Sequence, residues 1–339
     1  MRGPPMPKTL LALLFLPTLA HAGERWPEFR GPTADGHSDE KNLPLHWDEK
    51  TNIRWKTKIH GKGWSSPVLW GKQIWMTTAP PDGKELFAVC VDRDSGKIVH
   101  DIKVFSIAKP AFCHPFNSYA SPTPAVEEGR VYVHFGSAGT ACLDTASGKV
   151  LWTRQDLPCD HFRGPGSSPI LFGDLLILTF DGFDENYLVA LNRKDGKTVW
   201  KAERNIKPDQ SDGDWRKAYS TPAIIKLQDR SLLVSPGAMT SIALDPATGK
   251  EIWRVKHGGM NAASRPIFHD GKAIFTTGYN RGKSLVAVRI DGRGEVTQSH
   301  VAWTYDRGVP TRPSPLLVGD LLFLISDQGF ATCLEAKTG

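Results

Sequence analysis

The chain has 339 residues, of which 40% are apolar and 23% are charged, and it contains 11 Trp, 15 Phe and 6 Tyr. This composition is too apolar and too aromatic for a disordered chain. The formal net charge is +6, from 42 Lys and Arg against 36 Asp and Glu, and the chain has no run of five basic residues. A nucleic-acid partner is therefore not expected. The 32 Gly and 25 Pro are spread along the chain, which indicates many short elements joined by turns.

The N-terminus has the pattern of a secretory signal peptide. Arg2 and Lys8 precede an apolar stretch over residues 10–20, and Ala20-His21-Ala22 gives a small-x-small cleavage site. The apolar stretch is shorter than the roughly 20 residues that a transmembrane helix needs. We expect residues 1–22 to be removed on export, which leaves a mature charge of 40 − 36 = +4 and a periplasmic or secreted protein. The alternative is a buried N-terminal helix.

An internal repeat follows. Its clearest copies share a small residue, an Asp or Asn, a Gly-Lys pair and a Trp, and they lie at 142–152, 190–200 and 243–253. Weaker copies begin near residues 89, 287 and 333, and His100 replaces the Trp in the first of these. A proline lies upstream of each copy, with spacings of 44 to 57 residues: Pro67, Pro124, Pro169, Pro222, Pro266 and Pro315.

Each repeat unit is predicted to form four short strands. The first follows the Pro, the second follows a Gly turn, the third ends at the Asp and the fourth ends at the Trp. The Asp-x-x-x-Gly-Lys stretch between the last two is typical of a turn. A period of this length with four strands is typical of propeller blades, which bury their faces by stacking around an axis. The sequence therefore predicts an all-β fold, a β-propeller of four-stranded blades with about six blades present.

The pattern Ala-x-Asp-x-x-Thr-Gly-Lys-x-x-Trp resembles the tryptophan-docking repeat of the PQQ-like β-propellers. That group includes quinoprotein alcohol dehydrogenases and the outer-membrane assembly propeller proteins. The resemblance covers roughly residues 50–339, and the segments 26–32 and 163–169 are typical of short exported members. It implies that each repeat Trp packs against the neighbouring blade.

The resemblance also bears on domain organisation. It implies that Asn52–Trp55 is an outer strand that completes the last blade, and that an intact protein has seven or eight blades. On this interpretation, residues 23–50 form an N-terminal extension and residues 51–339 a C-terminally truncated propeller domain. We expect the full-length protein to be a monomer.

Five cysteines occur in the chain. Cys90, Cys142 and Cys333 align with alanines of the other units, so we expect small buried residues on the third strand of each blade. Cys113 and Cys159 lie in loops that lead into successive blades, and the sequence leaves open whether they form a disulfide or stay free. The spacings do not match a zinc site, a redox pair or a haem attachment site.

The loops that lead into the first strand of each unit carry the most unusual residues. Because the first strand of a blade is innermost, these loops are expected to meet at one mouth of the central channel. The candidate ligand-binding residues there are Trp64, His114, Asn117, Tyr119, His161, Arg163, Asp214, Arg216, Tyr219, Asn261, Arg265 and Arg312.

Arginine binds carboxylate or phosphate through two parallel hydrogen bonds, and aromatic rings stack on flat groups, so this set favours an anionic or polyhydroxyl ligand. The alternative is structural, with Arg–Asp pairs and Tyr hydroxyls joining the blades. Nearby carboxylates at 181, 184, 185, 209, 212 and 214 fit no calcium-loop spacing, so no metal site is expected.

The sequence contains no catalytic motif that we recognise. It predicts an exported, non-catalytic binding or scaffold protein whose mouth loops bind a protein, peptide or saccharide, with no cofactor. The first alternative, implied by the resemblance, is a PQQ-dependent dehydrogenase. Such enzymes need a disulfide between adjacent cysteines, a Ca²⁺ site with Glu and Asn, and a catalytic Asp, whereas this chain has no adjacent cysteines. The second alternative is another enzyme built from His114, His161 and the arginines.

Overall fold

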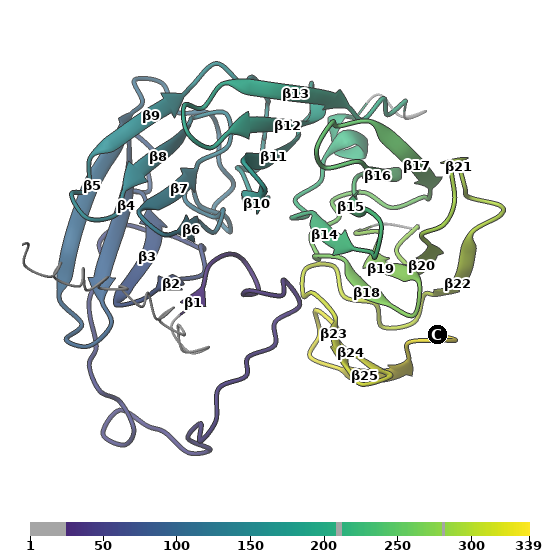
Figure 1. The fold of residues 1–339 in the computed structure, drawn as a ribbon, viewed down its shortest axis with the longest axis horizontal. Coiled ribbons are helices and arrows are strands. Elements are labelled where there is room, and N and C mark those ends of the chain that lie inside the picture. The colour runs from purple at the N-terminus through teal and green to yellow at the C-terminus, as the bar shows by residue number, and fades with distance from the viewer. Residues whose placement is uncertain (1–24, 208–211, 280–281) are drawn as a thin grey trace, which may run out of the picture.

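The computed structural model describes residues 25–207, 212–279 and 282–339. The predicted signal peptide over 1–22 and Asp209 of the acidic set lie outside these residues. Six β-sheets follow one another around a central axis (Figure 1). The first five each contain four antiparallel strands, the first and fourth have one short additional strand, and the sixth contains three strands. The predicted propeller is therefore confirmed, and the sheets are called blades 1 to 6 in chain order.

The strands of blades 1 to 3 are β2 (Val68–Trp70), β3 (Gln73–Thr78), β4 (Glu85–Asp92) and β5 (Ile98–Ser106), then β6 (Ala125–Glu127), β7 (Arg130–His134), β8 (Thr140–Asp144) and β9 (Val150–Arg154), then β10 (Ile170–Phe172), β11 (Leu175–Asp181), β12 (Asn186–Asn192) and β13 (Thr198–Glu203). Those of blades 4 to 6 are β14 (Ala223–Lys226), β15 (Ser231–Ser235), β16 (Thr240–Leu244) and β17 (Glu251–Lys256), then β18 (Ile267–His269), β19 (Lys272–Thr276), β20 (Leu285–Arg289) and β22 (Val301–Tyr305), then β23 (Leu316–Val318), β24 (Leu321–Ile325) and β25 (Ala331–Glu335). The insertion in blade 5 contains β21 (Gly294–Glu295), which pairs with β17 of blade 4.

The repeat pattern places the strands accurately. In all six blades the first strand begins at the residue after the repeat proline. The prediction that the fourth strand ends at the Trp is wrong, because the strand continues past it: Trp152 is the middle residue of β9. The longer strand satisfies more backbone groups of the neighbouring third strand.

The repeat tryptophans join adjacent blades, as predicted. The indole of Trp152 donates to the carbonyl of Arg193 at 2.9 Å, and its ring covers Gly196, where an added Cβ would lie 2.7 Å from it. Trp200 does the same with the carbonyl of Pro246 and with Gly249. Within its own sheet each Trp faces a small residue of the third strand, as Trp152 faces Cys142. The small residue leaves room for the indole.

The segment Asn52–Trp55 forms no strand, which corrects the prediction made for it. No described strand lies beside it, and a strand needs a hydrogen-bonded neighbour. Trp55 nevertheless docks like the other repeat tryptophans: its indole donates to the carbonyl of Arg93 at 2.8 Å and its ring covers Gly96.

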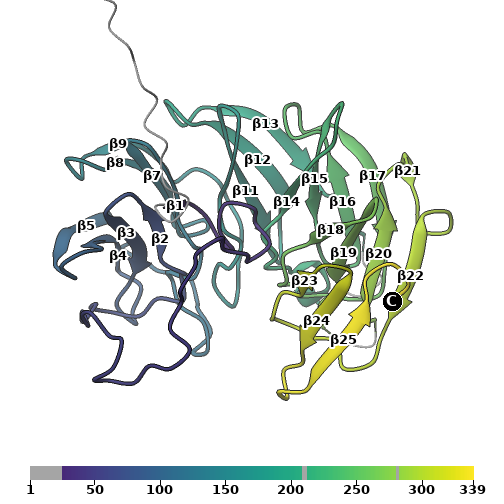
Figure 2. The same cartoon turned by 60° about the horizontal axis from the view of Figure 1, so that its bottom comes forward.

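Residues 25–37, here called the N-terminal plug, run along the inside of the ring. The short strand β1 (Arg25–Trp26) pairs with β2 of blade 1, and the carbonyl of Pro27 accepts from Val126 of blade 2. The purple trace then crosses from β1 toward β18 and β23 (Figures 1 and 2). There Arg30 donates to the carbonyl of Pro315 at 2.8 Å. The plug therefore connects the first two blades with the last two.

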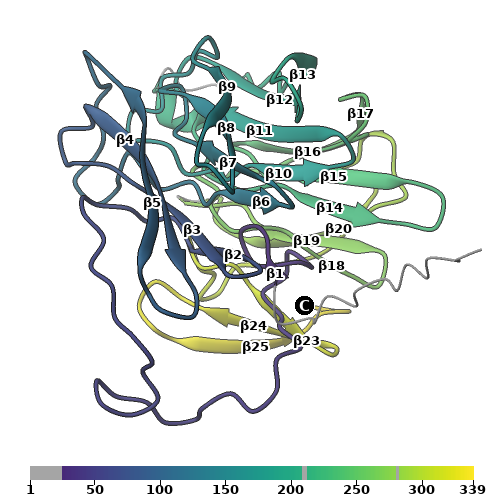
Figure 3. The ribbon, with the colours of Figure 1, turned by 60° about the vertical axis from the view of Figure 1, so that its left-hand side comes forward.

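The blades stack face to face, with their strands in successive layers (Figure 3). Buried clusters of Val, Leu, Ile and Trp fill the spaces between adjacent blades. Cys90 and Cys142 are buried there, as predicted, whereas Cys333 is exposed because it lies on a face of blade 6 that the described residues leave uncovered. No helix among the described residues has the length and apolar character needed to cross a bilayer.

Candidate functional site

The loops that lead into the first strands enclose a cavity of about 780 Å³, here called the mouth pocket. It is lined by Trp64, Phe116, Asn117, Arg163, Pro165, Gly166, Asp214, Tyr219, Asn261, Ala263, Tyr279, Thr311 and Arg312. Seven of the twelve predicted residues are among these. None of the lining residues belongs to a named strand, so the blades position a pocket that is built from loops.

An ion pair forms one wall of the mouth pocket. Asp214 lies in the short 3₁₀ helix η2 (Gly213–Arg216), whose N-cap Asp212 accepts from the Asp214 amide. Both carboxylate oxygens of Asp214 bind Arg163, one of them at 2.7 Å from Nη2. This hydrogen bonding raises the pKa of Arg163. The pair links the loops of blades 3 and 4, and both side chains stay partly exposed to the pocket.

Two buried polar atoms of the mouth pocket have no hydrogen-bond partner of normal geometry in the part of the chain that the structure describes. Tyr219 donates its amide to Ala262, and Asn261 donates its amide to Lys217, each at 2.7 Å, so the backbones of the two loops are tied together. The Tyr219 hydroxyl and the Asn261 side-chain oxygen are buried and make no hydrogen bond of normal geometry with the described residues, although the Arg163 guanidinium lies near the Tyr219 hydroxyl. Burial raises the pKa of Tyr219 to about 12, against the opposing effect of nearby Arg163, so the phenol remains protonated at neutral pH.

Aromatic side chains form the rim. The Trp64 side chain is 58% exposed, and its indole donates to the carbonyl of Phe116 at 3.1 Å. Phe116 and Tyr279 are also exposed. The guanidinium of Arg312 lies 5.9 Å from the Phe116 ring centroid, within range of a cation–π contact. The rim therefore presents aromatic faces to solvent.

Five predicted residues lie outside the mouth pocket. His114 and Tyr119 line a neighbouring cavity of about 410 Å³, which shares Asn117 with the mouth pocket. The Tyr119 ring packs on Gly83 of blade 1. The Arg216 side chain is not part of the pocket lining. The backbone carbonyl of Arg216 accepts a hydrogen bond from the Asn186 side chain. His161 is buried and accepts from the amide of Ser137.

Arg265 is the largest departure from the prediction. Its side chain is 1% exposed, and it donates to the carbonyls of Pro222 and Phe29 and to the carboxylate of Glu28. This arginine holds the N-terminal plug and does not face the mouth pocket. Arg265 therefore makes structural contacts with the N-terminal segment, whereas Arg163 and Arg312 line the pocket.

Sequence reasoning missed six lining residues. Phe116, Pro165, Gly166, Ala263 and Thr311 belong to the loops that it singled out, and the order of residues in those loops gives no sign of which side chains turn inward. Tyr279 belongs to the β19–β20 loop, where the repeat pattern provides no signal.

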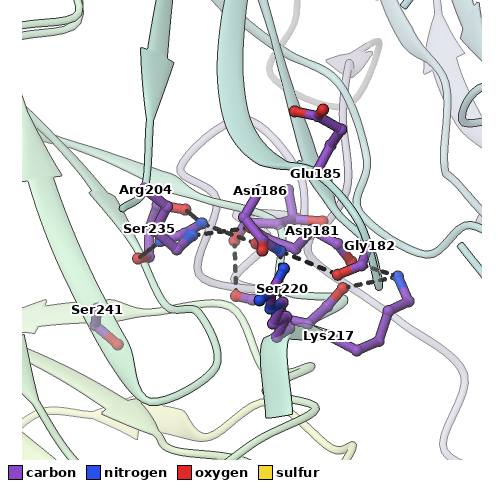
Figure 4. Close-up of polar contacts among 12 residues, drawn as sticks. Asp181, Gly182, Glu185, Asn186, Arg204, Lys217, Ser220, Ser235 and Ser241 are labelled. Carbon is purple, nitrogen blue, oxygen red and sulfur yellow. Dashed lines mark hydrogen bonds and ion pairs between the residues drawn. The ribbon is translucent and has the colours of Figure 1, made fainter. Parts of the chain in front are cut away.

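A buried polar network joins blades 3 and 4 (Figure 4). Arg204 binds both carboxylate oxygens of Asp181 at 2.8 Å and also the carbonyl and hydroxyl of Ser235. The ammonium of Lys217 donates to the Asp181 carbonyl at 2.7 Å. Each side-chain nitrogen of Arg204 and both carboxylate oxygens of Asp181 therefore have a hydrogen-bond partner inside the protein. Among the described residues no group of three or more His, Cys, Asp or Glu has the arrangement of a metal site.

The disulfide considered for Cys113 and Cys159 is not formed, and both thiols are free. Cys159 lies beside His161, with 3.7 Å between Sγ and Nδ1, whereas the Cys113 thiol faces the carbonyl of Arg163. Burial raises the pKa of both thiols. They therefore remain protonated and weakly nucleophilic at neutral pH.

Buried histidines predict acid sensitivity. Burial lowers the pKa of His134 and of His257 to about 3, and it lowers that of His161 well below its usual value. Unfolded histidine titrates near 6.5, so between these values the unfolded chain binds more protons than the folded chain. The contribution of these histidines to the free energy of unfolding should therefore be complete above pH 6.5 and decrease as the pH falls toward 3.

Urea unfolding at pH values from 7.5 to 4.5 measures this loss. The variant His134→Gln should show a shallower pH dependence than the wild type, because one titrating group is removed. Equal stability of the wild type at pH 7 and pH 4.5 would contradict the assignment of neutral buried histidines.

Comparisons with known proteins agree with the propeller geometry. BamB of Shewanella oneidensis, an outer membrane protein assembly factor, is 23% identical over 236 residues, which are 65% of this chain and 55% of the relative. The 1-butanol dehydrogenase (quinone) of Thauera butanivorans is 32% identical over 146 residues, or 38% of this chain and 21% of the relative. The chain therefore spans about half or less of the length of these curated relatives.

The crystal structure of BamB from Moraxella catarrhalis has the same fold, with a TM-score of 0.53 at 14% identity over 83% of this chain and 75% of that one. A family model described as outer membrane protein assembly factor BamB matches residues 47–225 and again 184–339. These two matches together cover nearly the whole propeller. The chain therefore belongs to the BamB family of PQQ-like repeat propellers.

Proposed function

We propose that this chain is an exported, non-catalytic binding or scaffold protein that takes a protein, peptide or saccharide ligand into the mouth pocket. The observation that carries the proposal is the combination, in one loop-built cavity of about 780 Å³, of exposed aromatic faces with two buried polar atoms that lack described partners. Such cavities, mostly apolar with a few placed polar groups, are typical of ligand sites. We place the protein in the periplasm or outside the cell, as a monomer.

A quinoprotein dehydrogenase is the second candidate, because one class of relative is quinone-linked. The donor set of the mouth pocket fits this chemistry poorly. A calcium ion beside a quinone requires free carboxylate oxygens, and among the described lining residues the one carboxylate, Asp214, is already bound by Arg163. The proposal therefore includes no PQQ and no other cofactor.

An enzyme built on His114 and His161 has still less support. His161 is buried, and its imidazole is kept neutral by its environment. His114 lines a different cavity from that formed by Arg163 and Arg312. The two histidines and the arginines thus do not form one catalytic site.

The test uses two classes of probe, a random heptapeptide library and a set of neutral oligosaccharides, titrated into the exported chain by calorimetry. The double variant Trp64→Ala/Arg312→Ala should weaken binding of any active probe at least about tenfold, since each truncation removes exposed contact area at the rim. Both side chains are exposed, so folding should be preserved.

The matched control is Trp47→Ala, which removes a tryptophan of similar exposure on the N-terminal extension and should leave binding unchanged. Equal binding by wild type and the Trp64→Ala/Arg312→Ala variant would show that the ligand does not bind in the mouth pocket and would contradict the proposed site. Failure of both probe classes to bind the wild type would overturn the proposed function.

A further inference from the structure

The charges of the mouth pocket are balanced. Arg163 is paired with Asp214, and Arg312 lies 3.2 Å from the carboxylate of Asp327. An anionic ligand would have to displace a carboxylate from one of these arginines. The lining therefore favours a neutral ligand over a phosphate or a carboxylate.

The two polar atoms without described partners favour a ligand that can both donate and accept hydrogen bonds. The Asn261 oxygen can only accept a hydrogen bond, whereas the Tyr219 hydroxyl can donate and accept. A hydroxyl group provides one donor and two acceptor positions. A ligand with several hydroxyls can therefore satisfy both atoms at once.

A row of aromatic side chains leads away from the mouth pocket over the loops of blades 2 and 3. This aromatic row consists of Phe116, His114, Phe112, Phe162 and Phe183. Successive ring centroids are 4.0, 6.4, 5.5 and 4.5 Å apart, in that order. Phe112, Phe116 and Phe162 are exposed. The row begins at the pocket with Phe116 and passes Arg163, whose guanidinium lies 5.2 Å from the Phe162 ring.

An exposed aromatic face is negative at its centre and attracts the C–H groups of a sugar ring, which carry a partial positive charge. A row of such faces suits a chain of repeated rings. An extended peptide would instead need backbone partners, as in strand addition to a sheet edge. The lining residues of the mouth pocket lie outside the named strands, so no described sheet edge is offered there.

Resting on the proposed function, we infer that the ligand is a neutral saccharide chain, with one end in the mouth pocket and the following sugar rings along the aromatic row. Tyr219 and Asn261 bind hydroxyls of the end unit. Phe112 and Phe162 stack on units farther along. Affinity should therefore increase with chain length.

Calorimetry with linear oligomers of glucose and of N-acetylglucosamine, two and six units long, tests this inference. For at least one sugar type the hexamer should bind at least about tenfold more tightly than the dimer. Phe112→Ala/Phe162→Ala should remove that gain and leave the dimer affinity unchanged. Tyr219→Phe should weaken the binding of dimer and hexamer by similar factors, because the Tyr219 hydroxyl binds the end unit of both.

Phe268→Ala is the matched control, since Phe268 resembles Phe162 in exposure and lies on the inner strand β18, outside both the mouth pocket and the aromatic row. Calorimetry with heptapeptides, carried out in parallel, distinguishes failure of the saccharide inference from failure of the proposed function. Peptide binding that depends on Trp64 without any saccharide binding overturns the saccharide inference and leaves the proposed function standing. Equal affinity for dimer and hexamer, or a hexamer affinity that Phe112→Ala/Phe162→Ala does not change, overturns the inference that sugar rings bind along the aromatic row.

Discussion

Replacing Arg204 with methionine should lower the free energy of unfolding by about 3–5 kcal/mol, the range observed when one partner of a buried ion pair is removed. The Arg204 and Asp181 side chains are 0% and 1% exposed. In the variant, the Asp181 carboxylate would remain buried without its cation, and the Ser235 carbonyl would lose its donor. Because Arg204 also binds Ser235 of blade 4, it joins the buried pair of blade 3 to the next blade, and chemical denaturation of the whole chain reports the loss.

Lys103→Met is the matched control, because Lys103 pairs with Glu85 where both side chains are well exposed. Exposed pairs contribute at most about 1 kcal/mol. The double variant Arg204→Met/Asp181→Asn should recover part of the stability, since the buried carboxylate that lost its cation is then removed as well. A loss for Arg204→Met no larger than that of the control would contradict the buried network.

Replacing Arg265 with methionine should release the N-terminal plug and lower the free energy of unfolding by about 2–5 kcal/mol. Arg265 binds Glu28 at 2.9 Å and the carbonyl of Phe29, so the variant leaves both without their donor. Arg30 would still donate to the carbonyl of Pro315 before blade 6, so the segment loosens at Glu28 and Phe29 while it stays attached there. Limited proteolysis should therefore cut residues 25–37 faster in the variant.

Arg312→Met provides the control for this prediction. Arg312 lies in the loop before blade 6, as Arg265 lies in the loop before blade 5, but the Arg312 side chain is 69% exposed. Its loss should change stability by less than about 0.5 kcal/mol. Similar stabilities of the two variants, or unchanged cleavage of residues 25–37 in Arg265→Met, would refute the role given to the plug.

The architecture could be predicted because it depends on local, repeated signals. The prolines mark the start of every first strand, and in several turns the Gly lies against the ring of the preceding Trp, as Gly196 lies against Trp152 and Gly249 against Trp200. A Cβ at such a glycine would collide with the indole, and its φ of +73° disfavours other residues. Each unit thus encodes its own fold and its contact with the next unit.

The roles of individual mouth residues could not be predicted in the same way. Arg163 and Arg265 both belong to the loops before their blades, although Arg265 directly precedes Pro266 whereas Arg163 lies farther from Pro169. Arg265 is buried against Glu28 and Phe29, which lie more than 230 residues away in sequence. The repeat gives no information on the path of the N-terminal segment, and the free Cys113 and Cys159 likewise depend on how two loops turn.

The most direct test of the mouth pocket is a crystal structure of the chain soaked with the glucose or N-acetylglucosamine hexamer. The account predicts electron density for a sugar ring within hydrogen-bond distance of the Tyr219 hydroxyl and the Asn261 side-chain oxygen. Further density should continue over Phe116 toward Phe162. An ordered saccharide bound elsewhere on the propeller, with the mouth pocket filled by water alone, would contradict it.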